Sequence, residues 1–161
     1  MHDDYSVAYF TVDKLDRAII DILQENGRLT NLELAQRVGL SPSPCLRRVK
    51  RLEEDGVITG YRAVVDPKAI GRGFNVIVYI DLSPIDSATL TAFEAAVQEV
   101  DAIIECHRMM SKPDYFLRVA VADLQAYEAL YTKSLAALPG VSTITSQIAM
   151  SHIKIAGRLP L

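Results

Sequence analysis

Hydrophobic positions recur at helical spacing from Asp13 to Glu25, in a segment that ends at Asn26-Gly27. The apolar stripe of this segment comprises Leu15, Ile19, Ile22 and Leu23. Its acidic positions are expected to face solvent: Asp16, Asp21 and Glu25. The pattern therefore predicts an amphipathic helix near the N-terminus, whereas residues 1–12 show no clear period.

Capping signals predict two further helices directly after the first. Thr30 and Glu33 have the spacing of a capping box, in which each side chain accepts a hydrogen bond from the backbone amide of the other. Gly39 suits the end of this second helix, and Ser41-Pro42 suits the start of a third. The expected inward stripe of the third helix is Leu46, Val49 and Leu52. Because only the short turn Gly39-Leu40 joins the last two helices, the spacing is that of a helix-turn-helix.

The second half of the chain alternates between strand-like and helix-like patterns. In order, the sequence predicts strand 74–82, helix 87–99, strands 103–110 and 114–122, helix 123–138 and strand 141–153. This β-α-β-β-α-β order is that of a ferredoxin-like sandwich, whose helices cover one face of an antiparallel sheet. We therefore expect an α+β chain with a helix-turn-helix domain at 1–60, a connecting strand and hinge at 61–73, and a ferredoxin-like domain at 74–161.

The strand predicted at 74–82 is apolar on both faces. Ile77 and Tyr79 share one face, while the other face carries Val76, Val78 and Ile80. A strand that is apolar on both sides is expected to be buried on both sides. The helices of the sandwich cover only one face, so a second subunit is the simplest cover for the other. A homodimer is therefore the smallest assembly that we expect.

The distribution of charge points to nucleic acid, although the formal net charge is −3. On the third predicted helix, Ser43, Arg47 and Lys50 recur at positions i, i+4 and i+7 of the outward face. A helix in the major groove of double-stranded DNA reads base edges with its N-terminal side chains, and flanking cations hold phosphates. We expect Arg47 to contact guanine, Arg51 to hold a phosphate, and the amides near Ser43 to receive another phosphate. The full set of expected DNA contacts is Ser41, Ser43, Pro44, Arg47, Arg48, Lys50 and Arg51.

A long, ordered series of motifs closely resembles the Lrp/AsnC family, the feast/famine transcription regulators. The series includes Val38-Gly39-Leu40-Ser41-Pro42-Ser43-Pro44-Cys45, Glu105-Cys106-His107, Asp114-Tyr115 and Leu138-Pro139-Gly140-Val141. The resemblance covers residues 13–160 and implies a winged-helix-like DNA-binding domain, tied by a strand to a ferredoxin-like domain for effector binding and oligomerisation. It further implies dimers formed through the sheet, higher oligomers that are often octameric, and an amino acid bound between dimers.

The loop before Asp114-Tyr115 departs from the family pattern. Relatives usually have Thr-Gly-x-x there, whereas this chain has Met110-Ser111-Lys112-Pro113. The effector contacts that the resemblance implies are Met110, Ser111, Asp114, Tyr115, Gln147 and Ala149. For Asp114, binding of an effector ammonium competes with a simpler role as a loop-capping carboxylate. The altered loop leaves the effector open, and with it an alternative function as a nucleoid-type architectural DNA-binding protein that needs no small molecule.

Other classes of function receive little support from the sequence. Cys45 and Cys106 are far apart and form no cysteine motif, which fits a reducing cytoplasm better than a disulfide framework. No apolar run is long enough to span a membrane, and neither a phosphate loop nor a recognisable catalytic arrangement is present, so we expect no enzyme and no cofactor. His107 and His152 have no metal-ligand spacing with the cysteines, so no metal is expected. A metal or redox sensor that uses either cysteine is a third hypothesis.

Overall fold

The computed structural model describes residues 11–151, 153–154 and 157–161. The chain forms two compact units, of which one comprises the chain up to Val64 together with Lys154–Leu161, and the other is Val65–Ile153. The final residues thus group with the first unit, although the sequence pattern assigned the whole range 74–161 to one domain. Within the described ranges, no helix is both long and apolar enough to cross a membrane.

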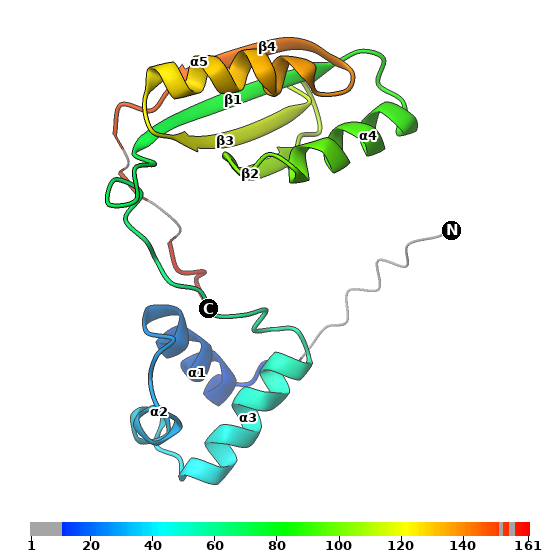
Figure 1. Cartoon of the computed structure of the whole chain (residues 1–161). Helices are drawn as coiled ribbons and strands as arrows, with labels where there is room; N and C mark the ends of the chain where they lie inside the picture. The colour runs from blue at the N-terminus through cyan, green and yellow to red at the C-terminus, as the bar shows by residue number, and fades with distance from the viewer. Residues whose placement is uncertain (1–10, 152, 155–156) are drawn as a thin grey trace. The chain divides into compact units, whose positions relative to one another are not determined.

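The first unit contains the three predicted helices: α1 Lys14–Glu25, α2 Asn31–Val38 and α3 Pro42–Glu54 (Figure 1). Capping boxes start two of them, with Asp13 and Asp16 at α1, and Thr30 and Glu33 at α2. At α2 the Thr30 amide donates to Glu33 Oε2 over 2.8 Å, and the Glu33 amide donates to Thr30 Oγ1 over 3.3 Å. Gly39, with φ 69°, ends α2 in the left-handed region that glycine tolerates. The short turn then leads directly into α3, which confirms the helix-turn-helix.

The core of the first unit corrects two predictions. It consists of Ile19, Leu34, Ala35, Cys45 and Leu52, each at most 3% exposed. Leu46 was expected to point inward but is 44% exposed, and Cys45 takes the inward position instead. The inward stripe therefore runs through Cys45, Val49 and Leu52. Asp16 was expected to face solvent but is fully buried, because arginines of α3 reach it.

The tail of the chain lies against α1. Two hydrogen bonds join the side chain of Gln24 to the backbone of Leu159. Gln24 Nε2 donates to the Leu159 carbonyl over 3.2 Å, and the Leu159 backbone N–H donates to Gln24 Oε1 over 2.7 Å. Arg158 Nη1 lies 3.6 Å from an Asp21 oxygen and 3.7 Å from a Glu25 oxygen. The surface of α1 in this unit is thus completed by residues from the other end of the sequence.

The connection after the helices is not the predicted strand. Residues 61–66 have no regular secondary structure, and residues 67–71 form turns. Because β-prone residues form a strand only where a partner backbone pairs with them, a strand here would need a backbone from outside these residues' own unit. Tyr61 nevertheless packs against the first unit. Its ring lies so close to Gly27 that a Cβ added there would come within 2.9 Å of the ring, and its hydroxyl donates a hydrogen bond to Glu53 over 2.9 Å. Burial and this contact with Glu53 raise the pKa of Tyr61 to about 12.

Within the described part of the second unit, antiparallel strands form one sheet in the order β2-β3-β1-β4 (Figure 1). The strands are β1 Phe74–Leu82, β2 Ile103–Arg108, β3 Tyr115–Val121 and β4 Val141–Ile148, and the helices are α4 Ser87–Gln98 and α5 Leu124–Lys133. A short 3₁₀ turn, Leu135–Ala137, follows α5. The order of the elements confirms the ferredoxin-like prediction. β1 has the predicted range, and the other elements are shorter than predicted by a few residues.

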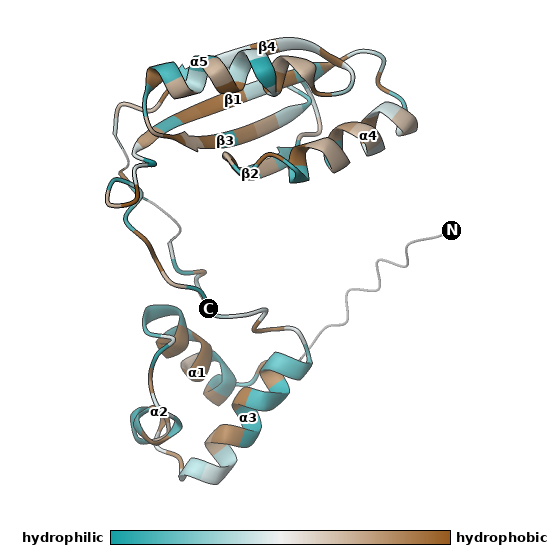
Figure 2. Ribbon diagram, in the orientation of Figure 1, coloured by the Kyte–Doolittle hydropathy of each residue, from teal (hydrophilic) through white to brown (hydrophobic). Residues whose placement is uncertain are grey.

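One face of this sheet carries the core. Val76, Val78 and Ile80 of β1 are fully buried and pack with Phe93 of α4 and Tyr127 of α5, so both helices cover the same face. Figure 2 shows β1 and β3 as largely hydrophobic strands beside these helices. Neither helix packs on the opposite face, which we call the open sheet face. Its residues include Ile77 and Tyr79 of β1, Phe116 and Arg118 of β3, and Thr145 and Gln147 of β4.

Candidate functional site

The outward face of α3 carries the cations of the candidate DNA-binding surface. Ser43, Arg47 and Lys50 are exposed and lie on the side of the helix opposite the buried Cys45 and Leu52. Figure 2 shows much of α3 as hydrophilic. In the described residues, the ion pairs of α3 involve Arg48 and Arg51 rather than Arg47 and Lys50. The charges of Arg47 and Lys50 are therefore available to an anionic partner.

Arg48 and Arg51 reach toward α1 and hold a buried carboxylate. Arg48 Nη1 lies 2.8 Å from Asp16 Oδ1 and 2.6 Å from Asp13 Oδ2, and Arg51 Nη2 lies 2.5 Å from Asp16 Oδ2. The backbone amide of Asp16, and after it the Arg48 guanidinium, lower the pKa of Asp13. The hydrogen bonds to Asp13 and Asp16 raise the pKa of Arg48. We call these four residues the α1–α3 ion cluster, and it fixes the orientation of α3 on α1.

The start of α3 offers fewer amides to a phosphate than expected. Proline has no backbone N–H, so Ser43 is the only donor among the first three residues, with Pro42 and Pro44 on either side. Ser41 is exposed and occupies the N-cap position without a side-chain capping bond. Asn31 of α2 donates from Nδ2 to the Pro42 carbonyl over 2.8 Å and so fixes the turn between the two helices. A phosphate at this end would rely on serine hydroxyls more than on backbone amides.

The structure gives Asp114 a partner within the chain. Met110 and Ser111 are exposed in the loop between β2 and β3. Asp114 Oδ2, in contrast, accepts a hydrogen bond of 2.8 Å from the Leu82 amide at the end of β1. The pairing of β1 with β4 has a register shift between Asp81 and Leu82, so Asp114 supports an irregularity of the strand. This is the structural role that competed with effector binding in the sequence.

Tyr115 lies in the core rather than in the loop. It is 1% exposed, its hydroxyl donates to Glu94 Oε1 over 2.6 Å, and its ring centroid lies 4.5 Å from that of Phe93. Burial, followed by the contact with Glu94, raises the pKa of Tyr115 well above its ordinary value. Tyr115 shares its strand face with the buried Leu117, so its side chain points toward the helices. An effector in the loop therefore has no access to this side chain.

A hollow of about 330 Å³ opens beside this loop; it is lined by Tyr79, Asp81, Lys112, Pro113 and Thr145. We call it the loop hollow. Gln147 lies on the same open sheet face, two residues beyond Thr145, while Ala149 donates its backbone N–H to the Asn75 carbonyl over 3.2 Å. Sequence reasoning missed Tyr79, Asp81 and Thr145 as site residues. Asp81 is the single charged residue of β1, which was the available signal.

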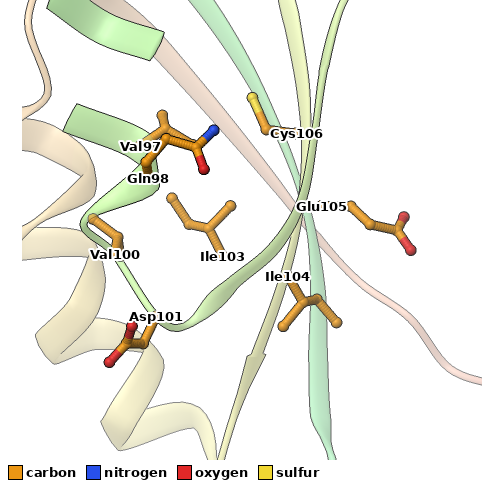
Figure 3. Close-up of a pocket in the computed structure, with 8 residues that line it drawn as sticks. All are labelled: Val97, Gln98, Val100, Asp101, Ile103, Ile104, Glu105 and Cys106. Atoms are coloured by element: carbon orange, nitrogen blue, oxygen red, sulfur yellow. The ribbon is translucent and has the colours of Figure 1, made fainter. Parts of the chain in front are cut away.

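A second hollow, of about 340 Å³, lies between the end of α4 and the edge strand β2 (Figure 3). Val97, Val100 and Ile103 line it together with Cys106, and Glu105 extends to the opposite side of the strand. None of its lining residues is a lysine or an arginine. Unlike the loop hollow, it does not combine a carboxylate with a cation.

The two cysteines lie in environments that suppress reactivity. Cys45 is buried in the core of the first unit, and Cys106 is partly buried on β2. Burial raises the pKa of both thiols, and the charge of Glu94 adds to this effect at Cys106. A raised pKa disfavours the thiolate that redox sensing and metal binding require. Among the described residues, which exclude His152, no three His, Cys, Asp or Glu side chains form a group suited to a metal ion.

Comparisons with known proteins match both units. The family described as winged helix-turn-helix DNA-binding matches residues 12–59, and the Lrp/AsnC ligand binding domain matches residues 75–159. The chain is 41% identical to the leucine-responsive regulatory protein of Salmonella typhimurium over 148 residues, which cover 92% of this chain and 90% of that protein.

Solved structures agree with these matches. A transcriptional regulator from Neisseria meningitidis, solved as a complex with L-methionine, is 35% identical with a TM-score of 0.89, covering 93% of this chain and 97% of that one. An AsnC family transcriptional regulator from Agrobacterium tumefaciens is 39% identical with a TM-score of 0.87, covering 92% and 96% of the two chains. With a helix-turn-helix unit, a ferredoxin-like unit and relatives that match nearly its whole length, this chain belongs to the Lrp/AsnC family of DNA-binding transcription regulators.

Proposed function

We propose that this regulator reads DNA with the exposed face of α3, and that an amino acid bound by its second unit modulates DNA binding. The observation that carries the first part is the division of the α3 cations. Among the described residues, Arg47 and Lys50 form no ion pair and are exposed, while Arg48 and Arg51 are bound by carboxylates at the start of α1. Arg47 is the candidate for a bidentate contact with guanine, and Lys50 for a phosphate. The proposed role of the protein is to bind DNA and regulate transcription rather than to catalyse a reaction.

Binding measurements on two duplexes test this assignment. A preferred duplex is selected from a random pool, and affinities for it and for a scrambled duplex are measured by fluorescence anisotropy. Arg47→Ala should cost about 1–3 kcal/mol on the preferred duplex and less on the scrambled one, because a base contact is lost. Lys50→Ala should weaken both duplexes alike and reduce the salt slope by about one unit. Arg17→Ala, which removes an exposed cation of α1, is the control. Unchanged affinity in both α3 variants would refute the assignment.

The open sheet face supports the proposal of a homodimer. Tyr79 and Phe116 place their rings there with centroids 6.0 Å apart, and Ile77 lies beside them, only partly buried. An apolar sheet face that its own helices do not cover gains stability when a second copy buries it. Arg118 on the same face has a buried Nε without a hydrogen-bond partner among the described residues. Higher assembly of such dimers, with the octamer as the expected size, follows from the family resemblance.

The amino-acid part of the proposal is supported by the Neisseria meningitidis relative, which was solved as a complex with L-methionine. A thermal-shift screen of this chain with the twenty amino acids tests it. A ligand that binds only the folded state raises its stability in proportion to the logarithm of its concentration. At least one amino acid should therefore raise the melting temperature of the second unit and change the affinity for the preferred duplex.

A second candidate function is that of an effector-independent architectural protein. Two observations favour it: Asp114 is bonded to the Leu82 amide and Tyr115 is buried, so two of the expected effector contacts are engaged elsewhere. Such a protein recognises the phosphate backbone of the DNA and the ease with which the DNA is deformed, rather than individual bases. No thermal shift with any amino acid, together with similar affinity for the preferred and the scrambled duplex, would support this function over a ligand-responsive one.

A further inference from the structure

We infer that the end of the chain is a second tether that orients the helix-turn-helix for DNA binding, with Gln24 and Arg158 as positioning residues. The inference rests on the proposed function, in which a homodimer reads two half-sites of a duplex with its two α3 helices. It adds the segment that limits the rotation of each helix-turn-helix, and therefore the spacing of half-sites that the dimer accepts.

One face of α1 is built to receive an arginine followed by an extended residue. Asp21 and Glu25 lie one helical turn apart, and Arg158 Nη1 lies 3.6 Å and 3.7 Å from their carboxylate oxygens. On the same face, Gln24 binds both backbone groups of Leu159, over 3.2 Å and 2.7 Å. Exposed contacts of this kind are weak one by one, but the tail is covalently attached, so its local concentration at α1 is high.

The two connections between the units meet the first unit close together. Tyr61, at the start of the connection that leads to β1, packs against Gly27 just beyond α1 and donates a hydrogen bond to Glu53. Leu159, near the end of the chain, is bound by Gln24. Because Gln24 and Gly27 are three residues apart, the two attachment points are separated by about one helical turn, roughly 5 Å.

The two connections also leave the second unit at one end of the sheet. β1 begins at Phe74 and β4 ends at Ile148, and the antiparallel pairing places Val76 of β1 opposite Ile148. Just after β4, the Ala149 backbone N–H donates to the Asn75 carbonyl over 3.2 Å. The chain therefore enters and leaves the sheet on neighbouring strands, which lie about 5 Å apart.

The lengths of the two connections determine what docking of the tail changes. The thirteen residues after Tyr61, up to Phe74, extend at most about 47 Å, and the nine residues after Ala149, up to Arg158, extend at most about 32 Å. A single connection lets a helix-turn-helix swivel about it. Two connections that start side by side and end side by side resist that rotation, and the shorter one limits the reach.

Rotation matters because a dimer must present both α3 helices to one duplex. Half-sites that are one helical turn apart, about 10 base pairs, face the same side of the DNA. An insertion of half a turn, about five base pairs, moves one half-site to the opposite side. A pair of oriented helix-turn-helix units rejects such a duplex, whereas a pair that swivels on single connections accepts it.

Duplexes that differ only in spacing test the inference with the full chain. The preferred duplex is compared with one that carries the half-turn insertion and with one that contains a single half-site. For the unmodified protein, the insertion should weaken binding at least about tenfold. For Arg158→Glu and for a chain that ends at Gly157, this penalty should fall below about threefold, while affinity for the single half-site stays the same. Lys154→Gln, which removes an exposed cation of the tail nearer the second unit, should keep the full penalty.

Reversal of the charges distinguishes orientation from a general loss of stability. Asp21→Arg and Glu25→Arg combined with Arg158→Glu restore opposite charges across the same contact, so the triple variant should recover the penalty for the insertion. Hydrogen exchange of the tail without DNA reports docking directly, because the Leu159 backbone N–H is bound by Gln24. Exchange at this amide should be fast in Arg158→Glu and slow again in the triple variant.

The outcomes separate this inference from the proposed function. A chain that ends at Gly157 with the full penalty, or an unmodified protein that ignores the insertion, would overturn the inference and leave the assignment of α3 intact. If Arg47→Ala and Lys50→Ala bind the single half-site normally, the assignment of α3 fails, while a penalty that disappears with the tail still supports the second tether. Should the shortened chain fail to fold, as judged by its melting curve, the triple variant decides, since it keeps the whole tail.

Discussion

Replacing Asp16 with asparagine tests the structural reasoning about α3 most directly. Asp16→Asn keeps the shape of a fully buried side chain but removes its charge and places an NH₂ group against an arginine donor. Two charge-assisted hydrogen bonds, from Arg48 over 2.8 Å and from Arg51 over 2.5 Å, are then lost or weakened. Because these bonds join α1 to α3, the whole helix-turn-helix should lose stability.

The geometry sets the expected magnitude. Two hydrogen bonds to a buried charged group would together contribute about 3–6 kcal/mol. The side chains of Arg48 and Arg51 are 26% and 49% exposed, so water solvates them once they are released and lowers the penalty. We therefore expect Asp16→Asn to reduce the free energy of unfolding of the first unit by about 2–3 kcal/mol. For a unit of this size that corresponds to a melting temperature lower by roughly 10–20 °C.

Calorimetry combined with hydrogen exchange of the amides in α1 and α3 measures this loss in the first unit separately from the second. Asp21→Asn is the matched control, because Asp21 is exposed on the same helix and its contact with Arg158 spans 3.6 Å. That control should change stability by no more than about 0.5 kcal/mol. The double variant Arg48→Met, Arg51→Met leaves a buried carboxylate without cations and should be at least as unstable as Asp16→Asn. If both Asp16→Asn and the double variant melt with the control, the α1–α3 ion cluster does not hold the two helices together.

Three further outcomes follow from other contacts. The hydrogen bond from the Thr89 amide lowers the pKa of Asp86, the N-cap of α4, below its ordinary 3.8. The capping carboxylate therefore stabilises α4 fully above pH 3.8, and this stabilisation is lost as the pH falls through the lowered pKa of the folded state. Asp86→Ser keeps a capping side chain that does not titrate, so its melting temperature in acid should depend less on pH than that of the unmodified protein. Gly140→Ala places a Cβ 2.1 Å from Thr89 Cγ2, at a residue whose φ is 71°. It should therefore lower the free energy of unfolding of the second unit by about 1–3 kcal/mol in urea titrations, and Thr89→Ser should partly restore it. An unchanged free energy of unfolding would contradict the crowding. Phe116→Asp should dissociate the dimer in sedimentation velocity, whereas Thr91→Asp on exposed α4 should not, and a dimeric Phe116→Asp would rule out the open sheet face as the interface.

Much of the fold was predictable because local signals and tertiary packing agree. β1 is a run of β-favouring residues between Gly73 and Ser83-Pro84, so its range followed from the sequence. The capping box of Thr30 and Glu33 fixed the start of α2 in the same way. In these elements the residues that decide the structure are neighbours in the chain, and the sequence displays them together.

The errors arose where the deciding partner is remote. Asp16 is buried only because Arg48 and Arg51 reach it from α3, and nothing next to Asp16 in the chain indicates this. Leu46 was assigned to the inward stripe, yet Cys45, one residue earlier, is fully buried and Leu46 is 44% exposed. The candidate site shows the same limit, since Asp81 and Lys112 come together only through the register of β1 in the sheet.

The contact of the tail with α1 has a consequence for synthesis of the chain on the ribosome. Leu159 and Arg158, which complete the surface of α1, are translated only after the whole of the second unit. The helix-turn-helix therefore emerges first but acquires its final contacts last, so folding of the first unit is not strictly vectorial. During that interval the matching surface of α1 lacks the hydrogen bonds and ion pairs that the tail supplies.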